Sequence, residues 1–219
     1  MTNLLPVVEQ FHSLQGEGFH AGKSAYFIRL AGCNVGCNWC DTKHSWAIDK
    51  YPLFSLESLL LEIEKAKLKG ASFLVITGGE PLHHNLDEFC SKIKNKKPND
   101  NKESIRIHLE TSGVNQLSGS FDWITLSPKR HYPPKEIFLK IADEIKIIID
   151  DTKDLQFAVE IKNEIMKLTN KTNSDILKKR FFIQPNWNNK NANSLAIEFV
   201  KNNPLWTLSI QAHKYLKLK

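Results

Sequence analysis

A short loop of this chain carries three cysteines within eight residues, Cys33, Cys37 and Cys40, directly after a predicted strand. Thiolates are ligands of iron–sulfur clusters and of many zinc sites, so three of them on one loop indicate a metal centre. Three ligands would leave one iron of a [4Fe–4S] cubane open to another molecule, whereas a structural zinc site is closed by four protein ligands. Both interpretations stay open on this motif alone, because His44 could complete a zinc site.

The fourth cysteine, Cys90, continues an apolar stripe at helical spacing within residues 86–93. This pattern predicts a small buried hydrophobic residue and not a fourth metal ligand. Four cysteines, three of them clustered, are typical of a reducing compartment and not of a disulfide framework.

Length and composition predict one soluble domain over residues 1–219, long enough to bury a full core. No apolar run reaches the length of a membrane span and the first residues lack a signal peptide, so we expect a cytoplasmic protein without a membrane partner.

The formal charge is +6, from 30 basic and 24 acidic residues. The lysines fall mainly on predicted helix exteriors such as 64–69, and the Asn/Lys-rich stretch 169–179 is typical of a surface connection. Because these lysines are spread over solvated helix faces, we expect no direct nucleic-acid binding.

Short apolar runs alternate with helical patterns along the chain, which predicts an α/β fold with a parallel sheet. The predicted strands cover 7–11, 25–31, 73–77, 105–110, 123–127, 145–149, 181–184 and 205–210. Helices are predicted before most of them, for example after the capping residue Ser55 and over 155–168 and 192–201. About six parallel strands plus extensions are too few for a closed eight-stranded barrel, so the prediction is an incomplete TIM-like barrel.

Two of these strands, 105–110 and 144–150, partly alternate polar with apolar residues. A parallel strand that is buried on both faces is normally apolar throughout. One face of the sheet is therefore predicted to line a wet cavity of ligand size.

Short polar segments, here called stations, directly follow several predicted strands. At residues 77–81, Thr-Gly-Gly-Glu-Pro, two glycines let the backbone approach a ligand, and Glu80 offers an anionic acceptor for an ammonium group. Further stations lie at 110–113, 127–129 and 184–187, and the carboxyl ends of parallel strands meet at one mouth. Each station alone is equally compatible with an ordinary turn or helix cap.

The cysteine spacing, with Trp39 before the last cysteine, resembles the signature of the radical S-adenosylmethionine (radical SAM) enzymes. The Gly-Gly-Glu-Pro station resembles the one that holds the methionine amino group of the cofactor in that superfamily, and together the two motifs disfavour zinc. Almost the whole chain, in order, is similar to the 7-carboxy-7-deazaguanine synthase family. The motifs that carry this resemblance are Glu9-x-Phe11-x-Ser13-x-Gln15-Gly16-Glu17-Gly18, Arg29, the three cysteines with Asp41-Thr42, Thr77 to Pro81, Glu110 to Gly113, Ser127-Pro128-Lys129, Gln184-Pro185 and Gln211-x-His213-Lys214.

The resemblance implies a radical SAM lyase that converts 6-carboxy-5,6,7,8-tetrahydropterin to 7-carboxy-7-deazaguanine with loss of ammonia, on the pathway to queuosine and other deazapurines. It implies a [4Fe–4S] cluster on the three cysteines, S-adenosylmethionine as the source of a 5′-deoxyadenosyl radical, and Mg²⁺ as a further cofactor. It also implies an external, flavodoxin-like electron donor and a homodimer. The substrate is a small pterin, although the product serves tRNA modification.

The same resemblance implies which residues form the binding sites. Contacts to S-adenosylmethionine would come from Trp39, Cys40, Asp41, Gly79, Glu80, Ser127, Pro128, Lys129, Gln184, Pro185, Asn186 and Trp187. Substrate contacts would come from Leu14, Gln15, Gly16, Glu17, Arg29, Thr77 and, at the end of the chain, Lys219. Thr42 would help to hold Mg²⁺, since a threonine oxygen suits a hard cation. The tail departs from the family pattern at Ala212, where threonine is usual, and at Lys219, which replaces an apolar or proline ending.

Arg29 shares a predicted strand face with Phe27 and Ala31, where a guanidinium group needs an anion. The anion is either the substrate carboxylate, which a guanidinium matches with two hydrogen bonds, or a nearby glutamate in a structural pair.

Two other functions compete with this interpretation. A small activase that generates a glycyl radical on a partner protein would share the cysteine spacing. A zinc-stabilised RNA-binding module would explain the cysteines and the basic charge without catalysis.

Overall fold

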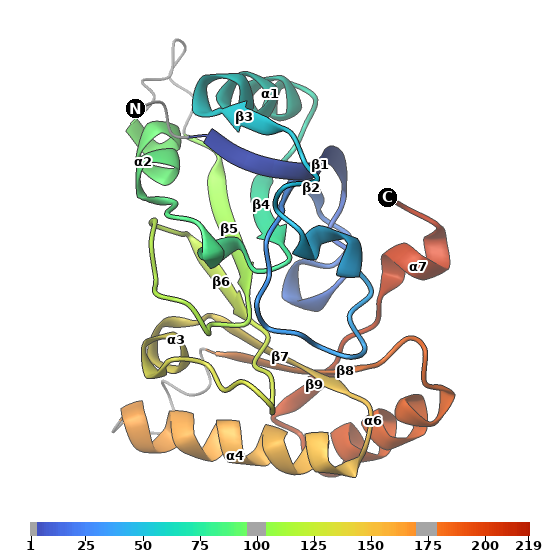
Figure 1. Cartoon of the computed structure of the whole chain (residues 1–219). Coiled ribbons are helices and arrows are strands. Elements are labelled where there is room, and N and C mark those ends of the chain that lie inside the picture. Colours follow the sequence, from blue (N-terminus) through green and yellow to red (C-terminus); the bar gives the residue numbers. More distant parts are fainter. Residues whose placement is uncertain (1–3, 96–103, 170–178) are drawn as a thin grey trace.

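The computed structural model describes residues 4–95, 104–169 and 179–219, so the predicted surface connection at 169–179 lies almost wholly outside the described residues. The described strands form one sheet in the order β3-β1-β2-β4-β5-β6-β7-β8-β9 (Figure 1). Their bounds are β1 Leu4–Leu14, β2 Ser24–Leu30, β3 Leu53–Ser55, β4 Phe73–Gly78, β5 Arg106–Thr111, β6 Trp123–Leu126, β7 Glu144–Ile149, β8 Arg180–Pro185 and β9 Trp206–Leu208. The strands from β2 to β9 pair in parallel, whereas β1 and β3 are antiparallel additions at the β2 edge.

Helices occupy most of the connections between parallel strands. The described α-helices are α1 Leu56–Leu68, α2 Asp87–Asn95, α3 Glu136–Ile141, α4 Thr152–Thr169, α6 Lys190–Asn202 and α7 Ala212–Leu216. The same described ranges contain three short 3₁₀ helices, η1 Gly18–His20, η2 Lys43–Trp46 and η3 Pro81–His83. The side chain of Ser55 accepts a hydrogen bond from the Ser58 N–H at 3.2 Å, so the predicted helix cap is confirmed. No helix among the described residues is long and apolar enough to cross a membrane.

The predicted incomplete barrel is confirmed. Its parallel series, β2-β4-β5-β6-β7-β8-β9, is one strand longer than the expected six, and its ends are not hydrogen-bonded to each other among the described residues. The connection between β5 and β6 contains no helix. Strand β3 was not predicted from the sequence, and β9 is shorter than expected.

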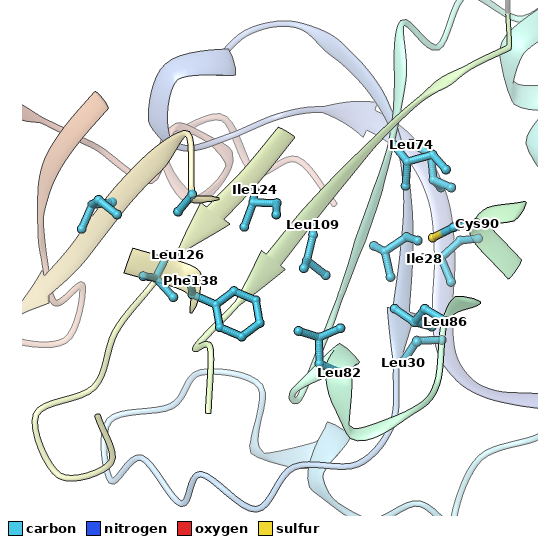
Figure 2. Close-up of a cluster of buried hydrophobic side chains, with 14 of the residues drawn as sticks. Ile28, Leu30, Leu74, Leu82, Leu86, Cys90, Leu109, Ile124, Leu126 and Phe138 are labelled. Carbon is cyan, nitrogen blue, oxygen red and sulfur yellow. The ribbon is translucent and has the colours of Figure 1, made fainter. Parts of the chain in front are cut away.

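The outer face of the parallel strands packs against the helices. Aliphatic side chains at every second position form one large core with residues of α1, α2, α3 and α4, and Figure 2 shows part of it around Leu74, Leu109 and Phe138. Cys90 is 1% exposed within this core, so the prediction that it is a packing residue is confirmed. In Figure 1, α4 and α6 lie along the outside of the last strands.

The inner face of the same strands carries the polar residues. Glu110 on β5 and Lys146 on β7 line a cavity, whereas His108 lies deeper and stacks on Phe73 with ring centroids 4.0 Å apart. The prediction of a wet inner face is therefore correct for the carboxyl ends of the strands. It is wrong for their amino ends, where aromatic rings fill the interior.

Candidate active site

A cavity of about 420 Å³ opens at the carboxyl ends of the parallel strands. Twenty-one of the residues predicted to bind cofactor, substrate or metal line it, and Pro128 is the one predicted residue that does not. The lining residues of this set are Leu14, Gln15, Gly16, Glu17, Arg29, Cys33, Cys37, Trp39, Cys40, Asp41, Thr42, Thr77, Gly79, Glu80, Ser127, Lys129, Gln184, Pro185, Asn186, Trp187 and Lys219. The fold thus brings together stations that are up to 205 residues apart, from Leu14 to Lys219, and their individual roles stay predictions.

The cysteine loop forms one wall of the cavity. Cys37 is 6% exposed and packs with Val35 and Val114 in a small apolar cluster that Cys33 and Cys40 border. Burial raises the pKa of the Cys33 and Cys37 thiols, so a bound metal would have to supply the charge that stabilises their thiolates. His131 from the connection after β6 contacts the Val35 carbonyl at 2.9 Å and fixes the loop from outside.

The arrangement of the thiols bears on the type of metal centre. Among the described residues, no three His, Cys, Asp or Glu side chains are placed to hold a single metal ion. A [4Fe–4S] cluster does not need such convergence, because each thiolate binds a different iron. Three free thiols on one short loop at the wall of a cavity therefore fit a cluster that keeps one iron accessible.

Glu80 follows β4 and is 1% exposed. Its carboxylate accepts hydrogen bonds from Thr111 Oγ1 at 2.6 Å, from the Ser112 N–H at 2.8 Å and from the Leu82 N–H at 3.2 Å, and the Ser112 hydroxyl also contacts it. These donors fix the carboxylate in one orientation at the cavity wall. The Glu80 carboxylate is thus buried and held by protein donors, unlike the side chain of an ordinary exposed turn.

Gly79 is required by the neighbouring cysteine loop. A Cβ atom at this position would lie 2.6 Å from the Cys33 Cβ and 2.7 Å from the Gly32 carbonyl oxygen. A larger residue would therefore displace the cysteine loop, and its effect could not be assigned to cofactor binding alone.

Lys129 and Gln184 also line the cavity. The Lys129 ammonium donates to Ser127 Oγ at 2.6 Å and lies 5.0 Å from the centre of the Trp39 ring, while burial lowers the pKa of this lysine. Gln184 is 1% exposed and accepts a hydrogen bond from Ser209 Oγ at 2.7 Å.

The floor of the cavity is charged. Lys146 contacts one carboxylate oxygen of Glu17, and Gln211 Nε2 donates to the other at 2.8 Å. Burial by itself would raise the pKa of Glu17, but the Lys146 ammonium, with hydrogen bonds from Lys146 and Gln211, outweighs it and lowers that pKa to about 2. Glu110 accepts hydrogen bonds from Gln15 Nε2 at 2.9 Å and Thr77 Oγ1 at 3.1 Å.

Arg29 has the protein partner that the sequence left open. Its Nε atom donates to Glu9 Oε1 at 2.9 Å, and the second oxygen of Glu9 lies 3.9 Å from Lys219 Nζ. The contact uses Nε only, so the two terminal nitrogens of the guanidinium group can still bind a second carboxylate side by side.

The C-terminal segment covers one edge of the cavity. The Ala212 N–H donates to the Gly16 carbonyl at 2.9 Å, and a Cβ atom on Gly16 would lie 2.3 Å from His213 Nδ1. Lys214 Nζ lies 2.8 Å from Asp41 Oδ2, which joins helix α7 to the end of the cysteine loop.

Comparison with known proteins assigns the family. The model of the Radical SAM superfamily matches residues 27–178. The chain is 50% identical to a 7-carboxy-7-deazaguanine synthase of Prochlorococcus marinus, covering 99% of each chain, and 33% identical to that of Escherichia coli K12, covering 97% of this chain and 98% of the relative. This chain belongs to the 7-carboxy-7-deazaguanine synthase family. A solved structure described as QueE from Escherichia coli superposes with a TM-score of 0.78 at 32% identity, over 96% of this chain and 95% of the other.

Membership of the 7-carboxy-7-deazaguanine synthase family makes this chain a radical SAM enzyme, which implies a [4Fe–4S] cluster and S-adenosylmethionine. The predicted identity and enzyme class are confirmed, and the activase and the RNA-binding module are not supported.

Several cavity residues were absent from the predicted site. They are Phe11, Phe27, Val35, Trp46, Gly78, Glu110, Thr111, Ser112, Thr125, Lys146, Ile148, Asn188, Gln211, His213 and Lys214. Sequence signals existed for some of them, because Glu110 and Lys146 carry the polar alternation and Gln211 belongs to a family motif. Their positions around the cavity depend on contacts between distant parts of the chain.

Proposed function

We propose that this enzyme converts 6-carboxy-5,6,7,8-tetrahydropterin to 7-carboxy-7-deazaguanine with loss of ammonia. The observation that carries the proposal is one cavity in which three free cysteines, the Arg29 guanidinium and the Glu17 carboxylate all line the wall. The substrate offers a matching set of groups, since it carries a carboxylate and an aminopyrimidinone edge with hydrogen-bond donors.

The cluster would be held by Cys33, Cys37 and Cys40. When bound, the reduced cluster and S-adenosylmethionine supply a 5′-deoxyadenosyl radical. Glu80 offers an oriented carboxylate for the cofactor ammonium, and Lys129 offers a cation beside the Trp39 ring. The remaining cofactor contacts are assigned to Cys40, Asp41, Gly79, Ser127 and the strand end Gln184 to Trp187.

Substrate orientation is assigned to a second group of residues that line the cavity. Arg29 is held by Glu9 through Nε and presents its terminal nitrogens to the substrate carboxylate. Glu17 is ionised and accepts the donors of the aminopyrimidinone edge. The other proposed contacts are Leu14, Gln15, Gly16, Thr77 and Lys219.

The remaining assignments follow from family membership. Thr42 lies at the cavity wall with its hydroxyl oxygen 3.5 Å from Cys40 Sγ, and we assign it to Mg²⁺ together with substrate and water oxygens. We also propose an external flavodoxin-like reductant, a homodimer and a cytoplasmic location.

The test is anaerobic incubation of the iron-reconstituted enzyme with S-adenosylmethionine, a reductant and the carboxypterin. We expect 7-carboxy-7-deazaguanine and ammonia in equal amounts, detected by mass spectrometry and an ammonia assay. The matched control is Cys40→Ala, which should yield neither. Stoichiometric zinc, or turnover only with an added protein substrate, would contradict the proposal.

A further inference from the structure

One buried cation on the cavity floor has no assigned role. Lys146 is 5% exposed, lies on the inner face of β7 and lines the cavity, and its ammonium contacts the Glu17 carboxylate. A buried ammonium is costly unless it is paired, so its presence at the floor of a binding cavity needs a reason. Building on the proposed function, we propose that Lys146 is a positioning residue that keeps Glu17 charged and oriented for the substrate.

The contacts of Glu17 support this role. Lys146 binds one carboxylate oxygen and Gln211 Nε2 binds the other at 2.8 Å, so both oxygens have fixed donors from opposite sides. Glu17 lies in the loop after β1, where no regular secondary structure holds its side chain. Its direction is therefore set by β7 and by the C-terminal segment, and not by its own backbone.

The other charges around this pair do not replace Lys146. Glu110 and Glu144 also face the ammonium, but Glu110 is hydrogen-bonded to Gln15 and Thr77, and Glu144 accepts the Phe19 N–H at 3.1 Å. His213 is a weaker electrostatic neighbour of Glu17. Lys146 is thus the main countercharge of Glu17.

Removing this countercharge has a defined consequence. Burial favours the protonated form of a carboxyl group, so without Lys146 the pKa of Glu17 should rise from about 2 to above its ordinary value of 4.5. A protonated Glu17 can no longer accept from two donors of a pterin edge. Substrate binding should then weaken at low pH and recover as rising pH ionises Glu17 again.

The experiment compares Lys146→Met, Glu17→Gln and the double variant in the reconstituted enzyme, with Lys201→Met as a surface-lysine control. We expect Lys146→Met to raise KM for the carboxypterin roughly ten- to a hundredfold at the acid end of the assayed pH range, with less effect at higher pH. Iron content and affinity for S-adenosylmethionine should match the parent enzyme. In the Glu17→Gln background, Lys146→Met should add less than about a threefold change.

The proposal would be overturned if Lys146→Met raised KM equally, and independently of pH, in the parent and Glu17→Gln backgrounds. That result would indicate a contact of Lys146 with the substrate or a merely structural role. A second measurement does not depend on turnover. In the parent protein labelled with ¹³C-glutamate, the Glu17 carboxyl resonance, assigned by its loss in Glu17→Gln, should not titrate between pH 4 and pH 8 (about 2 is the expected pKa). A midpoint inside that range would refute the pairing. If the parent enzyme failed to turn over the carboxypterin, this titration would still test whether Glu17 is held ionised in the cavity.

Discussion

The two ends of the barrel interior solve the burial of polar residues in different ways. At the carboxyl end, the carboxylates of Glu17, Glu80 and Glu110 each accept hydrogen bonds from at least two protein donors. At the amino end, His20 is 7% exposed, and neither of its ring nitrogens has a hydrogen-bond partner in the described part of the chain. One end fixes charges, and the other tolerates neutral polar atoms.

At the amino end, two histidines pack as aromatic rings. His20 lies with ring centroids 4.7 Å from His108 and 4.5 Å from Trp123, and His108 stacks on Phe73. Burial, with repulsion from nearby cations, lowers the pKa of His20 to about 4, and burial with repulsion from His20 and Arg106 lowers that of His108 to about 3. Both imidazoles are therefore neutral near pH 7. The same alternating pattern on a strand can therefore line a binding cavity or contribute to a plug, the packed aromatic rings that fill the amino end of the barrel.

The largest expected effect separates the cysteine loop from the core cysteine. Replacing Cys33, Cys37 or Cys40 by alanine should remove the cluster and abolish turnover, since each thiolate holds one iron. Cys90→Ala should retain about four irons per chain, because that side chain lies in the apolar core. Iron and sulfide analysis of anaerobically reconstituted proteins measures both. Iron loss in Cys90→Ala without unfolding would contradict the assignment.

The next effect concerns Arg29 at the carboxyl end. Arg29→Lys should lower kcat/KM for the carboxypterin roughly ten- to a hundredfold, because lysine keeps the charge but loses the planar pair of donors. Steady-state kinetics with a matched iron content provides the measurement. Glu9→Gln is the control, since it removes the negative charge of the Nε partner and leaves the terminal nitrogens of Arg29 in place. If Arg29 served only as the partner of Glu9, both variants would alter stability alike and neither would change KM.

A smaller effect tests the aromatic end. The native pKa of His20 lies below its ordinary value of 6.5, so the unfolded chain binds a proton between about pH 6.5 and pH 4 that the folded protein does not. This contribution to stability is present above pH 6.5 and is lost as the pH falls. His20→Phe should therefore reduce the loss of unfolding free energy between pH 7 and pH 5 by at most about 2 kcal/mol. Urea denaturation at both pH values measures it, and an unchanged difference would show that His20 titrates normally.

The smallest effect is expected at the rim of the cavity. Lys214 and Asp41 form an ion pair at 2.8 Å, with 21% and 49% of their side chains exposed. Lys214→Met should change the free energy of unfolding by less than about 1 kcal/mol, because solvent screens exposed pairs. Lys146→Met should cost more, since it leaves Glu17 buried without its countercharge. Denaturant unfolding measures the loss of unfolding free energy in both variants. Equal losses would show that the ion pair at the rim stabilises the protein as much as the buried pair on the floor.

Much of the fold was predictable because its signals are local. Strands such as β4 are short, apolar and flanked by helical patterns, and Ser55 stands directly before an apolar helical stripe. Strand β3 was missed because three residues carry too little periodicity. Its place in the sheet depends on pairing with β1, which lies about fifty residues earlier in the chain.

The candidate site also contains residues that local motifs identified and partners that come from distant parts of the chain. Motifs of fixed spacing identified the cysteine loop and the Glu80 station, since the chemistry of these groups depends on residues close together in the sequence. The partners of those groups come from elsewhere, such as Thr111 and Ser112 for Glu80 and Glu9 for Arg29. The sequence left the partner of Arg29 open, and pairing between antiparallel strands β1 and β2 places Glu9 opposite it.

The sequence by itself determined the family, the parallel sheet and the metal-binding loop, because each is written in residues that are neighbours or that repeat at a fixed period. Only the tertiary structure decided that Lys146, Gln211 and Glu17 meet, since they come from β7, the C-terminal segment and the loop after β1. It also decided that His108 fills the aromatic plug while Glu110, two residues later on the same face, lines the cavity. Charge and burial depend on what surrounds a side chain in space, and no local pattern records that.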